Sequence, residues 1–367
     1  MTKDEFKVTP WDVSGNIDYH KLIREFGIRP MGDLPEKFKD NILFRRNIIF
    51  AHRDFGDIIN AKKFVMMTGL MPSGKFHLGH MILAQQMLFY QKLGAKLYIA
   101  VADLEVYNAR NKSPAESRKI ALEQYLENYI ALGLKPKNVD FYFQSARSKD
   151  AKKSNAYYSL ASNFSRHATF NEFKAVYGEI TPGKMNASLI QAADMFHAQL
   201  PEFEGAINTL VPVGTDQDPH LRLARDIGKR YKEYNFKQLS STYHMFMPGL
   251  KGGKMSSSDE TSYIAMTDSP KEVESKIKNY AFSGGRDSLA EHKKHGGNPD
   301  IDVSFQYLKF FFEPNDKKLA QLHDDYKSGK LLTSELKNYT IEKINKFLKS
   351  HQAAKSKAGS RVNKFLK

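Results

Sequence analysis

Two histidines with a glycine between them form the most chemically suggestive group in the first half of the chain. They are His77, Gly79 and His80, in a stretch that also contains Gly69 and Gly74. Imidazole N–H groups can donate hydrogen bonds to phosphate oxygens, and a glycine leaves room for a nucleotide base to lie against the backbone. Two histidines near a turn are, by themselves, more often surface or capping residues. The group favours a nucleotide site only if a second element supports it.

The residues on either side predict where this group lies. A hydrophobic run at 64–67 predicts a buried strand, and the apolar segment 81–90 predicts a helix. The histidines then occupy a glycine-rich turn at a helix N-terminus, which favours an anion such as phosphate. A P-loop is the alternative, because Gly69 to Lys75 has the required spacing. It is disfavoured, since Phe76 stands where that motif needs a serine or threonine for magnesium.

The supporting element is a glycine-rich segment far downstream. Gly252 and Gly253 precede a lysine, a methionine and three serines: Lys254, Met255, Ser256, Ser257 and Ser258. A lysine in such a loop is a mobile cation that can close over a polyphosphate. A solvated linker would be the better interpretation of these residues alone. Together with the two histidines, they predict a triphosphate site in which His77, His80 and Lys254 act as hydrogen-bond donors.

Two further segments carry polar side chains next to apolar runs. Gly214 and Asp216 follow an apolar strand predicted at 209–213, where the glycine would let the backbone approach a ribose and the aspartate would accept from its hydroxyls. Gln191 and Asp194 are three residues apart in an apolar helical run, so they lie on neighbouring helix positions. They predict either a satisfied internal hydrogen bond or a polar contact inside an apolar pocket.

The predicted elements alternate in type along the chain. Strands are expected at 64–67, 96–103, 139–143 and 209–213, and Ser113 begins a capping pattern for one of the intervening helices. This alternation predicts an α/β fold with a doubly wound parallel sheet. We expect residues 1–62 to form an extension packed on the catalytic domain and 63–265 to form that Rossmann-like domain, with an insertion at about 104–188. Residues 266–367 should be α-helical and end in a basic tail that frays.

The composition limits the possible functions. Lysine and arginine number 56 against 41 aspartates and glutamates, and this net charge of +15 suits a polyanionic partner. The chain has no cysteine, which excludes disulfides and thiol catalysis. The absence of a long apolar run and the polar first residues predict a cytoplasmic protein without a membrane span. His292, His295 and Asp300 are a weak candidate for a metal cluster, because the glycines between them are flexible, and no metal site is predicted.

The two loops resemble the two signatures of class I aminoacyl-tRNA synthetases, His-Ile-Gly-His and Lys-Met-Ser-Lys-Ser. Here a serine replaces the second lysine, so Lys254 is the only lysine of its motif. Almost the whole chain is similar to tryptophanyl-tRNA synthetases of the archaeal and eukaryotic kind. The segments that carry the resemblance are Pro10-Trp11, Ile17-Asp18-Tyr19, 77–80, 216–219, 254–258, 281–287 and 302–305. The pair 281–287 and 302–305 is the most specific, because the sister tyrosyl enzymes lack it in this form.

The resemblance implies a role for each matching position. It implies that L-tryptophan is activated with ATP and Mg²⁺ and then transferred to tRNA(Trp), by a homodimer whose interface lies in the 104–188 insertion. ATP would be held by His77, Gly79 and His80, with Gly214 and Asp216 near its ribose. Lys254, Met255, Ser256, Ser257 and Ser258 would close on the pyrophosphate. Glu105, Gln191 and Gln217 would face the amino group and carboxylate of tryptophan, and Arg286 and Asp287 would meet the anticodon.

The chain departs from the eukaryotic members where they recognise the indole N–H. Those enzymes place a tyrosine and a glutamine where this chain has Met67 and Ala100. Asp194 matches an aspartate that bacterial tryptophanyl enzymes use. We therefore predict that Asp194 recognises the indole N–H and that Met67 is an apolar wall. A tyrosyl-tRNA synthetase of the same fold and a non-catalytic RNA-binding relative are the alternative functions.

Overall fold

The computed structural model describes residues 7–8, 13–14, 18–72, 74–110, 112–255 and 259–366. Pro10, Trp11 and Ile17 of the family resemblance lie outside the described residues, as do Ser256, Ser257 and Ser258. Near the start of the chain, β1 (Lys7–Val8) and β2 (Val13–Ser14) form a short antiparallel pair.

A seven-stranded sheet forms the centre of the protein, in the order β3-β4-β9-β8-β5-β6-β7. The strands are β3 (Arg29–Pro30), β4 (Ile49–Arg53), β5 (Phe64–Leu70), β6 (Lys96–Val101), β7 (Val139–Phe143), β8 (Asn208–Gly214) and β9 (Ser240–His244). The five strands from β5 to β9 are parallel to one another, whereas β4 is antiparallel to both β9 and β3. The predicted doubly wound parallel sheet is confirmed for these five strands.

The order of the parallel strands reverses between β5 and β8. The chain adds β6 and β7 on one side of β5, then returns to place β8 and β9 on its other side. In open α/β sheets, ligands bind outside the carboxyl ends of the strands at such a reversal. The topology therefore places the candidate site at the ends of β5 and β8.

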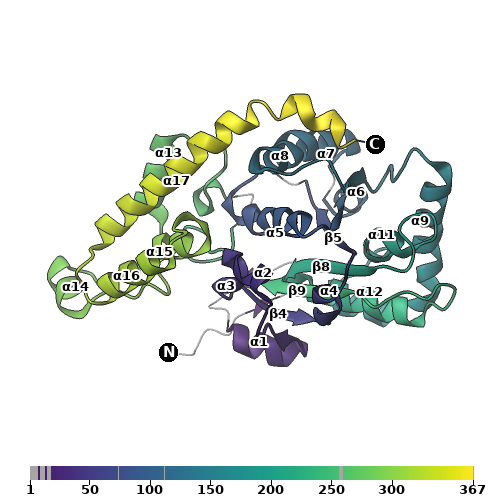
Figure 1. Cartoon of the computed structure of the whole chain (residues 1–367), viewed down its shortest axis with the longest axis horizontal. Helices are drawn as coiled ribbons and strands as arrows, with labels where there is room; N and C mark the ends of the chain where they lie inside the picture. Colours follow the sequence, from purple (N-terminus) through teal and green to yellow (C-terminus); the bar gives the residue numbers. More distant parts are fainter. Residues whose placement is uncertain are drawn as a thin grey trace.

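Both faces of the sheet are covered by helices. Met66 and Leu97 belong to the core on one face, and the adjacent Met67 and Tyr98 belong to the core on the other. Because both faces are buried, β6 is an uninterrupted apolar run from Leu97 to Val101. Figure 1 shows α5 (Met81–Lys92) and α8 (Glu127–Leu132) on one side of the sheet and α11 (Pro182–Phe196) and α12 (Asp218–Arg230) on the other.

Parts of the expected extension and insertion belong to the sheet itself. β4 pairs with β9, so the N-terminal segment lengthens the sheet, with α1 (Tyr19–Phe26), α2 (Glu36–Lys39), α3 (Ile42–Arg45) and α4 (Gly56–Ile59) around it. β7 lies within the 104–188 stretch and pairs with β6. The rest of that stretch is largely helical, including α6 (Asp103–Arg110), α7 (Pro114–Ile120), α9 (Ala151–Phe164) and α10 (Phe170–Tyr177).

The C-terminal third is helical, as the sequence predicts. Its helices are α13 (Pro270–Tyr280), α14 (Leu289–His295), α15 (Val303–Tyr307), α16 (Asp316–Lys327) and α17 (Thr333–Lys355). Among the helices that the structure describes, none is both long and apolar enough to cross a membrane.

The prediction that the basic tail frays is wrong. Figure 1 shows α17 running from the C-terminal helices back to α7 and α8. Its end is held there by a 2.7 Å hydrogen bond between His351 and Asn128. Beyond the helix, Ala358 and Phe365 are buried in the same core as α8. Burial of these apolar side chains outweighs the repulsion among the exposed lysines, so the tail is docked.

Candidate active site

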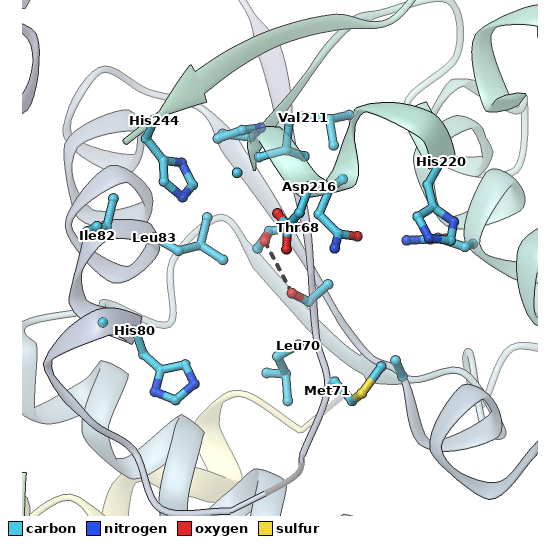
Figure 2. A pocket seen from close by; sticks show the side chains of 18 of the residues that line it. Thr68, Leu70, Met71, His80, Ile82, Leu83, Val211, Asp216, His220 and His244 are labelled. Atoms are coloured by element: carbon cyan, nitrogen blue, oxygen red, sulfur yellow. Dashed lines mark hydrogen bonds between the residues drawn. The ribbon is translucent and has the colours of Figure 1, made fainter. Parts of the chain in front are cut away.

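A cavity of about 450 Å³ opens at the carboxyl ends of β5 and β8. Figure 2 shows side chains from β5, β8, β9 and α5 around it. Twelve of the residues predicted for the site line this cavity: Met67, His77, Gly79, His80, Glu105, Gln191, Asp194, Gly214, Asp216, Gln217, Lys254 and Met255. Segments almost 180 residues apart in sequence (77 and 254) thus meet at the strand-order reversal.

The backbone determines the protonation of both histidines. The Nδ1 of His77 accepts a hydrogen bond from the Gly79 amide at 3.2 Å, and the Nδ1 of His80 accepts one from the His77 amide at 3.1 Å. In a neutral imidazole the nitrogen that accepts carries no proton, so in each ring Nε2 carries it. Burial lowers the pKa of His77 to about 2, with a smaller effect from His80, and lowers the pKa of His80 to about 4. At neutral pH each ring is therefore an uncharged donor through Nε2–H.

Aromatic packing holds the two rings in place. Their centroids are 3.8 Å apart, and His77 also lies 4.8 Å from the ring of Tyr263. His80 packs against Phe76 at 4.9 Å and Tyr125 at 5.2 Å. Phe76 stands where a P-loop would need a serine or threonine for magnesium, and its side chain is almost fully buried. It packs against His80 and so stabilises the histidine turn.

The lysine loop reaches the histidine turn. Lys254 Nζ lies 2.9 Å from a carboxylate oxygen of Asp216 and 5.4 Å from the ring centre of Phe246. Met255 covers Gly79, since a Cβ on that glycine would lie only 2.9 Å from the methionine sulfur. The cation predicted to close over a polyphosphate is thus already inside the cavity, paired with an aspartate.

The end of β8 shows why a glycine stands at position 214. A Cβ there would lie 2.7 Å from a carboxylate oxygen of Asp216 and 2.9 Å from the Phe246 ring. The backbone dihedral angles of Gly214 are those of ordinary extended structure, which any residue can adopt. The glycine is therefore required by close packing and not by a special conformation. Its small size lets Asp216 turn back toward the cavity and meet Lys254.

Asp194 lies at the buried end of the cavity and accepts three hydrogen bonds. The hydroxyls of Tyr142 and Tyr157 both donate to its Oδ1 at 2.7 Å, and Nε2 of Gln144 donates to its Oδ2 at 2.7 Å. Complete burial raises the pKa of Asp194 to about 6, although the three hydrogen bonds act to lower it. At neutral pH the group is a buried carboxylate, held by side chains from β7 and α9.

A buried cation, Arg147, acts on this carboxylate. Arg147 forms a 2.9 Å ion pair with Asp140 and donates to Nε2 of His197 at 2.8 Å. Its guanidinium also lies 4.0 Å from the ring centre of Tyr142. A nearby cation favours the charged form of Asp194, which offsets part of the cost of burying it.

The other predicted amino-acid contacts lie on three elements around Asp194. Glu105 is buried on α6, Gln191 is half-buried on α11, and Gln217 is half-buried in the turn after β8. Met67 lies on the same face of the sheet as Asp194 and lines the cavity. The predicted polar contacts and apolar wall are therefore brought together around one space.

A family model described as tRNA synthetases class I (W and Y) matches residues 60–349. The chain belongs to this family. It is 41% identical to a tryptophan–tRNA ligase of Aeropyrum pernix, over 96% of this chain and 95% of that protein. It is also 41% identical to one of Methanocaldococcus jannaschii, over 96% of each chain. The crystal structure of the A. pernix tryptophanyl-tRNA synthetase superposes with a TM-score of 0.89 at 40% identity, covering 95% of this chain and 96% of that one.

Arg286 and Asp287, expected at the anticodon of a class I synthetase, are exposed and lie outside the cavity. They end the 281–287 motif, which forms a tight junction with 302–305. The Gly284 amide donates to Asp302 at 2.9 Å, and a Cβ on Gly284 would lie 1.9 Å from the carbonyl oxygen of Asn298. The segments 281–287 and 302–305, which are the most specific to the family, therefore pack against each other within the helical region.

The residues that line the cavity but were missed by the sequence analysis include Gln144, His220, His244 and Phe246. Gln144 follows directly after β7, and Phe246 follows β9 by two residues. The rule that ligands bind at the carboxyl ends of parallel strands would have identified both. His220 is buried and carries no comparable signal, whereas His244 is the last residue of β9 and the same rule would have identified it.

Proposed function

We propose that this chain is a tryptophan–tRNA ligase. It would activate L-tryptophan with ATP to tryptophanyl-adenylate and transfer the tryptophanyl group to the 3′ end of tRNA(Trp). The relatives named above support this function over nearly the full length of the chain. The observation that carries it is the meeting of Lys254, the two neutral histidines and the buried Asp194 around one cavity.

We assign the part of the cavity lined by the histidine turn and Lys254, the nucleotide half, to ATP. The Nε2–H groups of His77 and His80 donate to phosphate oxygens, Gly79 faces the base, and Asp216 accepts from the ribose beside Gly214. For this, Met255 must move off Gly79 and Lys254 must exchange Asp216 for a phosphate. His80 must likewise exchange the Tyr125 hydroxyl, 3.5 Å from its Nε2, for a phosphate oxygen. Ser256, Ser257 and Ser258, which lie outside the described residues, would join Lys254 on the leaving pyrophosphate.

Mg²⁺ enters this scheme as the counter-ion of ATP. Among the described residues no three histidine, aspartate or glutamate side chains are grouped to hold a metal ion. Mg²⁺ commonly binds through substrate phosphates and water with few protein ligands, so this arrangement suits a metal that arrives on the triphosphate.

The chemistry requires no side-chain nucleophile. The carboxylate of tryptophan attacks the α-phosphorus of ATP, pyrophosphate leaves, and a ribose hydroxyl of the tRNA 3′ end then takes the tryptophanyl group from the adenylate. The protein contributes position and charge stabilisation. Because the pKa values of His77 and His80 are lowered to about 2 and 4, these residues act as hydrogen-bond donors and not as general bases.

The amino-acid half holds tryptophan by both ends. Glu105, Gln191 and Gln217 take its amino group and carboxylate. The indole lies against Met67 with its N–H directed to the Asp194 end of the cavity. A buried acceptor at that end disfavours side chains without a donor, phenylalanine above all.

The remaining surfaces are assigned to tRNA and to a second subunit. We assign catalysis to residues 63–265 together with the N-terminal extension, and anticodon binding to residues 266–367 through Arg286 and Asp287. The net charge of +15 suits tRNA. We assign the homodimer interface to the 104–188 stretch, as the family resemblance implies. A cytoplasmic location follows from the need for tRNA.

ATP–pyrophosphate exchange tests the proposal. Exchange is expected with tryptophan and not with tyrosine or phenylalanine at equal concentration. A preference for tyrosine would identify a tyrosyl enzyme instead. Binding of tRNA without exchange for any amino acid would identify a non-catalytic RNA-binding protein.

A further inference from the structure

The side-chain carbonyl of Gln144 is a buried acceptor with no hydrogen-bond partner in the described part of the chain. Gln144 is 1% exposed and lines the cavity next to Asp194. Buried polar atoms in native proteins are nearly always paired, so an unpaired one beside a ligand cavity needs an explanation. A donor supplied by the ligand would provide one.

The Asp194 carboxylate determines which end of the Gln144 amide is unpaired. A carboxylate only accepts hydrogen bonds, so it must face the Nε2 of Gln144, to which it is bonded at 2.7 Å. Turning the amide over would place Oε1 against the carboxylate, with two acceptors in contact. The unpaired end is therefore the carbonyl, which can only accept.

Two neighbouring positions offer no side-chain acceptor for the indole N–H. Met67 and Ala100, where eukaryotic relatives carry a tyrosine and a glutamine, have apolar side chains. Ala100 pairs in register with Tyr142 on β7, and Gln144 stands two residues beyond that tyrosine. Asp194 itself already accepts from Tyr142, Tyr157 and Gln144.

We infer that Gln144 recognises the indole N–H of tryptophan, through its carbonyl oxygen, while its amide nitrogen stays bonded to Asp194. Asp194 is then a positioning residue that orients the glutamine, and the two tyrosines orient Asp194. This inference rests on the proposed function and replaces the direct Asp194–indole contact that the sequence suggested.

Selectivity for a nitrogen-bound hydrogen tests the assignment. We would measure kcat/KM in ATP–pyrophosphate exchange for tryptophan and for 3-(benzothiophen-3-yl)alanine, in which sulfur replaces the N–H. The intact protein should prefer tryptophan by on the order of 100-fold or more, because the analogue leaves a buried acceptor unpaired. In Gln144→Met this ratio should fall below about tenfold, with the KM for ATP unchanged.

Gln191→Met is the matched control. Gln191 is another glutamine of the same cavity, assigned to the backbone end of tryptophan. Its loss should lower kcat/KM for both amino acids together and leave their ratio as in the intact protein. A Gln144→Met protein that retains the full ratio would overturn the inference.

A measurement on the unaltered protein covers the case in which Gln144→Met does not fold. In a crystal structure with bound tryptophan, Gln144 Oε1 should lie within hydrogen-bond distance of the indole nitrogen. An indole nitrogen bonded to Asp194 and out of reach of Gln144 would refute the inference while leaving tryptophan activation intact. Absence of any tryptophan-dependent exchange would instead refute the proposed function, and the inference with it.

Discussion

The two halves of the cavity are held in place by different means. In the nucleotide half, backbone amides set the two histidine rings, and one partly exposed lysine pairs with Asp216. In the half assigned to the amino acid, buried side chains from β7, α9 and the residue after β7 converge on Asp194 of α11. The first half contains a contact that can be exchanged, and the second contains contacts that must not move.

The energetics of each half fit its task. A partly exposed ion pair such as Lys254–Asp216 contributes little, on the order of 0–1 kcal/mol, so a phosphate can replace the aspartate easily. A buried group that loses its partner costs more, about 1–3 kcal/mol. In the proposed function, the exchangeable contact lies where a polyphosphate would bind, and the buried contacts lie where one amino-acid side chain would be distinguished from another. Four predictions test this contrast.

The largest effect is expected for Lys254→Ala. Loss of one well-aimed donor to a developing charge typically costs ~3 kcal/mol in the barrier, so adenylate formation should slow by about a hundredfold or more. Filter binding of tRNA should be nearly unchanged. Lys251→Ala is the control, because Lys251 lies on the same loop but pairs with Asp259 on the surface, and it should have little effect. An equal loss of pyrophosphate exchange and tRNA binding in Lys254→Ala would contradict the assigned role.

Gly79→Ala should act on ATP alone. Its Cβ would lie 2.9 Å from the Met255 sulfur and would occupy the space assigned to the base. We expect the KM for ATP to rise roughly tenfold, about 1.4 kcal/mol, while the KM for tryptophan stays constant. Steady-state exchange with each substrate varied in turn would measure both. A parallel rise in the two KM values would show that the halves are not independent.

Tyr157→Phe should affect the binding of tryptophan and leave the binding of ATP unchanged. It removes one of two hydroxyls that donate to Asp194 Oδ1, which should raise the KM for tryptophan several-fold and lower stability by ~1–2 kcal/mol. Tyr98→Phe is the control, since this buried tyrosine bonds to Glu204 away from Asp194. It should lower the melting temperature without changing the KM for tryptophan. A changed KM for ATP in Tyr157→Phe would argue against separate halves.

The smallest expected effect is a pH dependence of the KM for tryptophan, with no matching change in the KM for ATP. Burial raises the pKa of Asp194 to about 6 from its ordinary value of 3.8, so its contribution to stability is greatest below pH 4 and is lost as the pH rises through 6. Binding should respond in the opposite direction, because protonation weakens the bond that orients Gln144. The KM for tryptophan should rise modestly as the pH falls from 8 to 5, and Asp194→Asn should abolish this change. His77 and His80 stay neutral in that range, so they add no inflection to the KM for ATP.

The same contrast explains how far the sequence could be interpreted. The histidine turn and the lysine loop are each one contiguous stretch, and backbone hydrogen bonds within the histidine turn position its rings, so residue type and spacing could single out both stretches. The parallel sheet followed from the alternation of apolar strands and helices. The amino-acid half depends on side chains 37 to 52 residues away from Asp194, and no local pattern shows that they converge.

Tertiary packing alone decided the remaining features. The lysine-rich tail resembles a solvated helix end, yet Ala358 and Phe365 dock it on α8. Gln144 has no sequence signal apart from its place after a strand, and only the structure pairs one end of its amide and leaves the other unpaired. A local sequence determines where the backbone turns and which groups it can hold. Long-range burial determines which of those groups lack a partner, and in the cavity it leaves the Gln144 carbonyl facing the space for a ligand.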